Sequence, residues 1–250
     1  MKSRTAVIVA ALLAVAGAGA AEAATFSVNP TQIYLTGKTN SSLLTLRNDS
    51  SEPLRFQLSA FAWAQSTSGE IQLEPTKDVV FFPALLTLKP GEERRVRIGS
   101  VVPVGAREST YRVFVEELPP LEATSQGAAV RMLTKMGIPI FLRPASEREV
   151  MSVDGLAAAA GRLRFTLANG GSVHVIPKQI TARATDAGGK PLFEQDVPGW
   201  YILAGGRRDF DVEVAQADCA RVVNYTVSVE YSGGTITRTL PTPQGACAAQ

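Results

Sequence analysis

The chain has 250 residues, 45% of them hydrophobic, and its 25 basic and 23 acidic side chains leave a formal net charge of +2. This balance argues against a nucleic-acid binder, which usually carries a strongly basic patch. One histidine and two cysteines exclude a multi-histidine site, a four-cysteine zinc site and the ligand set of an iron–sulfur cluster. We therefore expect no metal and no small-molecule cofactor.

Residues 1–23 have the features of a secretory signal peptide. Lys2 and Arg4 form a positive start, the stretch from Thr5 to Ala21 is uncharged, and Ala21-Glu22-Ala23 fits a cleavage site with small residues. A membrane anchor is the alternative reading, but this stretch is marginal for a span of about 20 residues. We predict that the mature protein is exported.

Cys219 and Cys247 are the only cysteines of the chain. Because exported proteins fold in an oxidising compartment, the sequence predicts a disulfide between them. Such a bond closes a loop of roughly 28 residues, worth about 3–4 kcal/mol in the chain-entropy model. A catalytic thiol is the alternative, but no neighbouring residue suggests the base that it needs.

The mature chain consists of short runs of alternating apolar residues, and helical periodicity is nearly absent. Leu44 and Leu46 lead into the turn residues Asn48-Asp49-Ser50. Runs with the same alternation are Leu54, Phe56 and Leu58; Val96 and Ile98; and Tyr111, Val113 and Val115. Many short strands separated by turn residues are typical of an all-β sandwich.

The second half of the chain repeats the pattern of the first. Leu44–Asn48 is echoed by Phe165–Asn169, and Leu88–Gly91 is echoed by Leu203–Gly206, each turn leading into an alternating strand. Two echoes in the same order predict two sandwich domains of similar type.

The boundary between these domains is predicted at Arg143-Pro144-Ala145-Ser146, where an apolar run ends in a proline and a polar cluster. We expect one domain over residues 24–143 and a second over residues 149–250.

The run that ends at this boundary is unusually long. Six of the seven even positions from Val130 to Leu142 are apolar, which predicts a strand of about 45 Å. Pro139 suits an edge strand or a bulge, because proline cannot donate to a ladder. The run is either an ordinary core strand or an edge kept available for a partner chain. A free edge also allows weak self-association between copies.

A set of motifs that together cover most of the mature chain resembles one known family. The motifs are Phe26–Thr31, Leu44–Asn48, Trp63, Phe82-Pro83, Leu88–Gly91 with Val96–Ile98, Glu108–Arg112, Glu117–Pro120 and Ile138–Pro144. In order and spacing they are similar to those of the periplasmic pilus (fimbrial) chaperones of the chaperone–usher pathway.

This resemblance implies two immunoglobulin-like β-sandwich domains, set at an angle with a cleft between them. It implies a periplasmic, non-enzymatic chaperone that completes the sandwich of a pilin subunit with its own long strand, by donor-strand complementation. The implied partners are pilin subunits and an outer-membrane usher that assembles the pilus. The implied process is pilus biogenesis, with a role in cell wall organisation.

The resemblance also assigns roles to residues of the long strand. Val130, Met132 and Met136 are expected to enter the groove of the subunit, together with Ile138 at the end of the segment. An internal core face is the alternative for Met136 and Ile138.

In the family, an Arg on the first strand and a Lys on the long strand anchor the C-terminal carboxylate of the subunit. This sequence departs from the pattern, because Gln32 stands at the Arg position and Pro139 at the Lys position. Arg112 and Lys135 are the nearest substitutes for a cation that a buried carboxylate requires. An exposed surface charge is the alternative for each.

Glu108 and Arg143 match family positions that form an ion pair near the domain junction. We expect them to fix the angle between the domains. His174, in the alternating run Ser172–Val175, is expected to be a structural or surface residue.

Two other classes of protein remain as alternatives. One is a secreted β-sandwich protein with a structural or adhesive role at the cell surface, which would lack the long apolar edge. The other is an enzyme, for which no Gly-x-Ser-x-Gly elbow is present.

Overall fold

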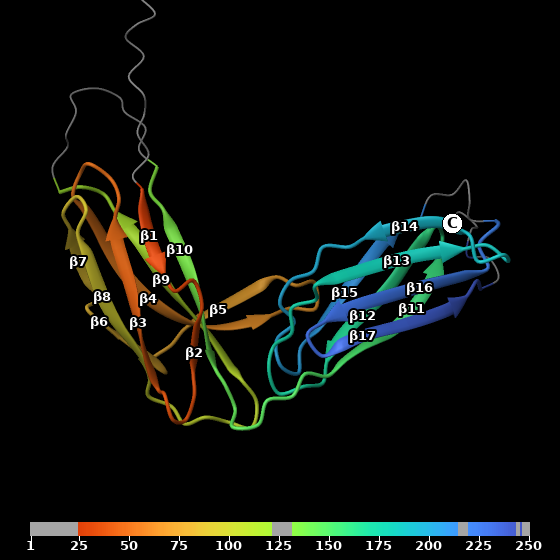
Figure 1. Cartoon of the computed structure of the whole chain (residues 1–250), viewed down its shortest axis with the longest axis horizontal. Coiled ribbons are helices and arrows are strands. Elements are labelled where there is room, and N and C mark those ends of the chain that lie inside the picture. The colour runs from red at the N-terminus through yellow and green to blue at the C-terminus, as the bar shows by residue number, and fades with distance from the viewer. Residues whose placement is uncertain (1–24, 122–131, 215–219, 244–245, 247–250) are drawn as a thin grey trace, which may run out of the picture.

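The computed structural model describes residues 25–121, 132–214, 220–243 and 246. These residues form β-strands and connecting loops (Figure 1). None of them belongs to a helix with the length and hydropathy that membrane crossing requires. The predicted signal peptide, Val130, and the predicted disulfide between Cys219 and Cys247 lie outside the described residues.

The strands from Phe26 to Leu142 form two facing sheets, which we call the N-terminal domain. These strands are β1 (Phe26–Asn29), β2 (Ile33–Leu35), β3 (Ser41–Asn48), β4 (Leu54–Gln65), β5 (Ile71–Pro75), β6 (Val79–Phe82), β7 (Leu85–Leu88), β8 (Glu93–Ser100), β9 (Ser109–Leu118) and β10 (Lys135–Leu142). One sheet has the order β1-β3-β8-β6. The other has the order β2-β10-β9-β4-β5, and β7 pairs with β4.

Alternation of apolar residues explains these strands, because successive side chains point to opposite faces of a sheet. Leu44 and Leu46 of β3 are fully buried, and so are Val113 and Val115 of β9. All four belong to one core between the two sheets. Arg112 and Phe114, which alternate with these valines in β9, therefore lie on the outer face of the sheet.

The long strand is shorter than its sequence pattern predicts. Within the described residues, β10 begins at Lys135, and Met132–Thr134 have an irregular conformation. The last backbone bond to β9 runs from the Glu117 amide to the Thr134 carbonyl, at 2.9 Å. Beyond that point β9 ends at Leu118, so Met132 and Leu133 pair with no strand among the described residues.

The strands from Met151 to Pro241 form a second pair of sheets, which we call the C-terminal domain. They are β11 (Met151–Ala159), β12 (Arg162–Asn169), β13 (Gln179–Thr185), β14 (Pro191–Asp196), β15 (Arg207–Glu213), β16 (Asn224–Tyr231) and β17 (Gly234–Pro241). The sheets have the orders β11-β12-β15 and β14-β13-β16-β17. No sheet among the described residues combines strands of both domains.

The sequence repeat corresponds to a pair of matching turns, one in each domain. Asn48 ends β3 and Asn169 ends β12, and both side chains are buried. Asn48 Nδ2 donates to the carbonyls of Glu52 (2.7 Å) and Leu88 (3.0 Å). Asn169 Nδ2 donates to the equivalent carbonyls of Val173 (2.8 Å) and Ile202 (2.9 Å).

A glycine closes each of these turns. The amide of Gly91 donates to the Asn48 carbonyl and that of Gly205 to the Asn169 carbonyl, both at 2.9 Å. Both glycines have positive φ, 72° and 73°, which residues with a Cβ rarely adopt. Gly91 thus matches Gly205, and the predicted match of Leu88–Gly91 to Leu203–Gly206 is wrong by one residue.

The two domains lie at an angle and are joined near the base of the molecule (Figure 1). The β4–β5 hairpin extends from the N-terminal domain toward the C-terminal domain. At its tip, the Thr67 carbonyl accepts a hydrogen bond from the Asp209 amide at 2.8 Å. The hairpin therefore connects the domains a second time, in addition to the covalent linker.

Candidate functional site

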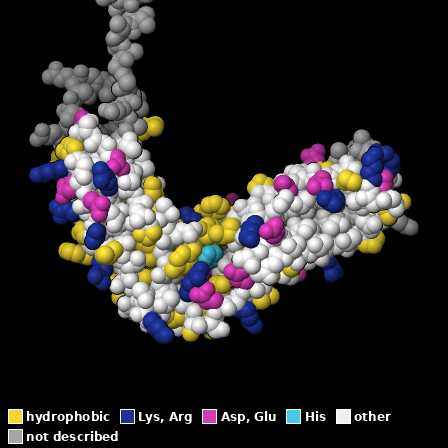
Figure 2. Space-filling model, in the orientation of Figure 1, with side chains coloured by type: hydrophobic (Ala, Val, Ile, Leu, Met, Phe, Trp, Pro, Cys, Tyr) yellow, Lys and Arg dark blue, Asp and Glu magenta, His cyan; other side chains and the backbone are white. Residues whose placement is uncertain are grey.

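A small hydrophobic cluster joins the two domains. Trp63 of β4 and Phe141 of β10 lie on the outer face of the β2-β10-β9-β4-β5 sheet. Tyr201 and Leu203 come from the C-terminal domain. The Trp63 and Tyr201 rings meet edge to face, with centroids 5.3 Å apart. Figure 2 shows hydrophobic side chains gathered where the domains meet, with the single histidine beside them.

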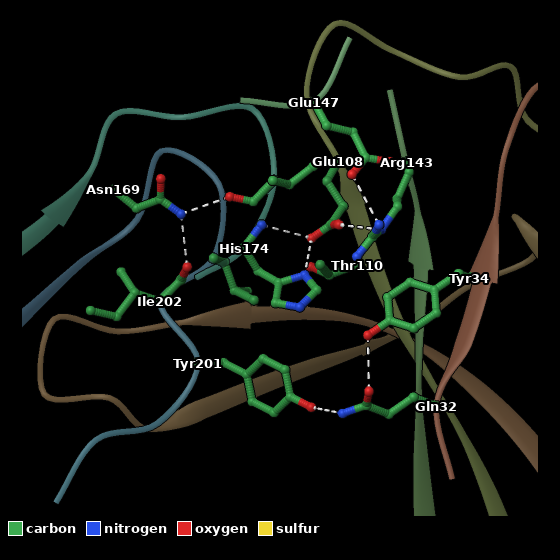
Figure 3. Close-up of polar contacts among 12 residues, drawn as sticks. Gln32, Tyr34, Glu108, Thr110, Arg143, Glu147, Asn169, His174, Tyr201 and Ile202 are labelled. Carbon is green, nitrogen blue, oxygen red and sulfur yellow. Dashed lines mark hydrogen bonds and ion pairs between the residues drawn. The ribbon is translucent and has the colours of Figure 1, made fainter. Parts of the chain in front are cut away.

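A polar network lies next to this cluster (Figure 3). The Glu108 side chain is fully buried, and its Oε1 lies 2.7 Å from His174 Nδ1 and 3.1 Å from the His174 amide. Arg143 Nε lies 3.9 Å from Glu108 Oε2. Arg143 also contacts Glu147 at 2.9 Å and lies over the Tyr34 ring at 4.2 Å. Glu108, expected to pair with Arg143, is thus bound more closely by His174 across the junction.

His174 is only 8% exposed, so of the two expected environments it has the buried one. Its ring stacks on Phe141 with centroids 3.9 Å apart. The sequence did not indicate that this residue and Glu108, 66 positions apart, would meet.

Arg112 lies on β9 directly opposite Pro139 of β10, the position where the family resemblance expects a lysine. Its guanidinium lies 4.2 Å from the centroid of the Trp63 ring. Among the described residues no carboxylate pairs with it, and its buried Nε has no hydrogen-bond partner. Burial lowers the pKa of Arg112, an effect that Tyr201 partly offsets. The site therefore holds a partly desolvated cation next to both domains.

Lys135, the other predicted cation, has different surroundings. Its Nζ lies 3.0 Å from Glu116 on the neighbouring strand, and half of the side chain is exposed. It also lies 5.0 Å from the Phe114 ring centroid, and three residues along β10 separate it from Pro139. The structure thus brings Arg112, but not Lys135, to the domain junction.

The predicted donor residues fall into three environments. Met132 is 73% exposed, Met136 is half-buried against the core of the N-terminal domain, and Ile138 is 1% exposed within that core. The prediction that Ile138 enters the groove of a partner is wrong, because this side chain already packs inside its own domain. Val130 lies outside the described residues.

The edge of β10 changes along its length. Ile140–Leu142 pair with β2 on one side and β9 on the other. Lys135–Pro139 pair with β9 only, so among the described residues the opposite edge has no partner strand.

Three residues of the junction were not singled out as site residues by their sequence pattern. Trp63 appeared only within a family motif, Gln32 only as a departure from one, and Tyr201 not at all. An aromatic Trp200-Tyr201 pair between two predicted strands was the one available signal for Tyr201. Its contacts with Gln32 and Trp63 depend on how the domains pack.

Comparison with known proteins shows what the N-terminal domain resembles. Residues 25–147 match the model of the pili and flagellar-assembly chaperone family, PapD N-terminal domain. The chain is 31% identical over 124 residues to chaperone protein PmfD of Proteus mirabilis, a match that spans 48% of this chain and 46% of that protein.

Solved structures extend the likeness to both domains. The class 5 fimbriae chaperone CfaA superposes with a TM-score of 0.59 at 15% identity, covering 88% of this chain and all of CfaA. The chaperone–tip adhesion subunit complex CsuC–CsuE of Acinetobacter baumannii contains a chain that gives a TM-score of 0.58 at 16% identity and the same coverage. At these identities the likeness concerns the fold. Residues 25–147 thus resemble the N-terminal domain of the pilus-assembly chaperones, and the chain as a whole has the two-domain β-sandwich fold seen in CfaA.

Proposed function

We propose that this protein is a periplasmic chaperone that binds pilus subunits by lending them a strand and delivers them to an outer-membrane usher. The observation that carries the proposal is the edge of β10, which has no strand partner along Lys135–Pro139 within the described residues. An open strand edge can add a partner strand through main-chain hydrogen bonds.

The side chains next to this edge supply the second part of the interaction. Met132 is exposed just before β10, and Val130 precedes it by two positions in the sequence, which is the spacing of side chains on one face of a strand. We infer that both enter an apolar groove of the subunit, with Met136 at its border. Burial of each stabilises the complex by about 1.5–3 kcal/mol. Methionine adapts to irregular pockets, which suits a chaperone with several subunits to bind.

Arg112 is proposed as the anchor for the C-terminal carboxylate of the subunit. Its guanidinium has no carboxylate partner among the described residues, whereas Lys135 is paired with Glu116. Burial disfavours the charged form of Arg112, and a bound carboxylate would stabilise that form. Arg112 thus takes the place of the lysine that relatives have at the position of Pro139.

Partner and compartment follow from the same proposal. The related CsuC was solved together with the tip adhesion subunit CsuE, which supports a pilus subunit as the partner here. Removal of residues 1–23 on export would place the mature chain in the periplasm, where a disulfide between Cys219 and Cys247 can form.

Co-expression with candidate pilin subunits from the same organism tests strand donation. The wild-type chaperone should be purified from the periplasm in an equimolar complex with the subunit. Replacement of both Val130 and Met132 by Asp should abolish this complex, because two charges would enter an apolar groove. The matched control is Val101→Asp, at an exposed apolar position of the same domain, which should retain it. Recovery of stable, folded subunits without the chaperone would contradict the proposal.

The anchor is tested by comparing the two cations. Arg112→Ala should weaken subunit binding about tenfold or more, as loss of a charge-assisted hydrogen bond does. Lys135→Ala should change it little. The measurement is complex yield and dissociation constant, with circular dichroism as the check on folding. The reverse order of effects would move the anchor to Lys135.

A further inference from the structure

A chain of hydrogen bonds runs from the N-terminal to the C-terminal domain beside Arg112. The Tyr34 hydroxyl donates to Gln32 Oε1 at 2.9 Å, and Gln32 Nε2 donates to the Tyr201 hydroxyl oxygen (Figure 3). The first bond orients the Gln32 amide, so that its NH₂ group faces Tyr201. Every donor in the chain points toward the C-terminal domain.

This series of hydrogen bonds ends at the hydrogen of the Tyr201 hydroxyl. Its oxygen accepts from Gln32, and no hydrogen bond found in the described part of the protein uses this hydroxyl as a donor. Burial, followed by the effect of Tyr34, raises the pKa of Tyr201. The phenol therefore stays protonated at physiological pH and retains a hydrogen to donate.

Other donors next to Tyr201 also lack an acceptor. Trp63 packs between Arg112, whose Cζ is 4.2 Å from the Trp63 ring centroid, and Tyr201, at 5.3 Å between centroids. Arg112 Nε and Trp63 Nε1 are both buried without a hydrogen-bond partner among the described residues. Buried polar groups in folded proteins are nearly always paired. These donors, one of them on the cation Arg112, have no acceptor among the described residues, and such a site fits an anionic ligand with two oxygens.

We propose that the Tyr201 hydroxyl donates a second hydrogen bond to the subunit carboxylate held by Arg112, so that both domains form the anchor. This inference rests on the proposed function, since it needs a carboxylate at Arg112. Gln32, which stands where relatives have an arginine, acts as a positioning residue that holds the Tyr201 hydroxyl toward the site. One consequence is that a bound subunit tail connects the two domains directly.

The alternative is that Tyr201 only packs, because its ring contacts Trp63 and Phe141. A ring alone would serve that purpose, and phenylalanine would replace it without loss of binding. The two roles therefore predict different losses of affinity. If the hydroxyl binds the carboxylate, its removal weakens binding only of a ligand that has the carboxylate.

The test uses a synthetic peptide with the C-terminal strand sequence of a pilin that co-purifies with this protein, prepared as the free acid and as the carboxamide. Fluorescence anisotropy gives the dissociation constant of each peptide for the mature full-length protein. The wild type should prefer the acid. Tyr201→Phe should weaken binding of the acid by about 10- to 100-fold, as expected for a hydrogen bond to a charged group, and leave binding of the amide unchanged. Tyr231→Phe, at a buried tyrosine elsewhere in the same domain, is the matched control and should alter neither.

Different results overturn different claims. An equal loss for acid and amide with Tyr201→Phe would show that Tyr201 acts by packing, and no loss would exclude any role of its hydroxyl. Either outcome overturns this inference and leaves the Arg112 anchor in place. If the wild type binds acid and amide equally, the carboxylate anchor itself fails. If it binds neither, the proposed function fails with it.

Discussion

At the scale of single residues, two buried asparagines organise equivalent turns in the two domains. The Asn48 side chain satisfies two backbone carbonyls and accepts a bond from the Ser50 amide at 2.9 Å. Asn169 does the same, accepting from the Gly171 amide at 2.9 Å. In both turns an asparagine side chain thus forms the hydrogen bonds with backbone groups that main-chain pairing forms within the strands.

The first prediction concerns Asn48. Asn48→Ala should lower the free energy of unfolding by about 2–4 kcal/mol, because it leaves backbone groups buried without partners. Chemical denaturation measures the change. Asn40→Ala, at an exposed position of the same domain, is the control and should stay within about 0.5 kcal/mol of the wild type. Equal effects at the two sites would contradict a structural role for the Asn48 bonds.

Single residues also show where prediction from sequence ends. The buried and exposed faces of β9 follow from the alternation of Tyr111, Val113 and Val115, which also puts Arg112 on the outer face. The residues that pack on that outer face do not follow from this alternation. Trp63 lies on a neighbouring strand and Tyr201 in the other domain, and no local pattern predicts that they meet.

At the scale of elements, β10 has two parts with different environments. Its C-terminal part is a core strand between β2 and β9, and its N-terminal part is a strand edge. Period-two alternation extends through both, because the same face is apolar throughout. The pattern therefore overestimates the strand, which forms only where a neighbouring strand provides hydrogen bonds.

Gly137 provides a prediction about this element. A Cβ at Gly137 would lie 2.9 Å from Cε1 of Phe114, whereas one at Gly37 would have its nearest neighbour at 3.7 Å. Gly137→Ala should therefore cost about 1–3 kcal/mol by overpacking. Gly37→Ala should be neutral or slightly stabilising. Thermal melts of the two variants compare them directly, and equal melting temperatures would show that Phe114 moves aside without cost.

At the scale of the whole molecule, the relative position of the domains rests on contacts between distant residues. These are the aromatic cluster, the β4–β5 hairpin and the Glu108–His174 pair. The Glu108 carboxylate is fully buried, so it depends on its partners for stability.

A prediction about domain orientation follows. Glu108→Ala should destabilise the protein by about 3–5 kcal/mol, since it removes one member of a buried charged network. It should also broaden the distribution of angles between the domains, which small-angle X-ray scattering detects as a larger radius of gyration. Glu147→Ala removes only an exposed partner of Arg143 and should cost less than about 1 kcal/mol. An unchanged scattering profile for Glu108→Ala would assign the angle to the aromatic cluster instead.

The sequence by itself determined the all-β fold, the repeated domain with its turn asparagines, and the long apolar run ending in a proline. These are local properties, because alternation and turn chemistry act between residues close in the chain. Tertiary structure alone decided that Ile138 belongs to the core, that Glu108 meets His174, and that Arg112, Trp63 and Tyr201 share one site. Such contacts join residues of different strands and domains, and their energies depend on packing that no local pattern records.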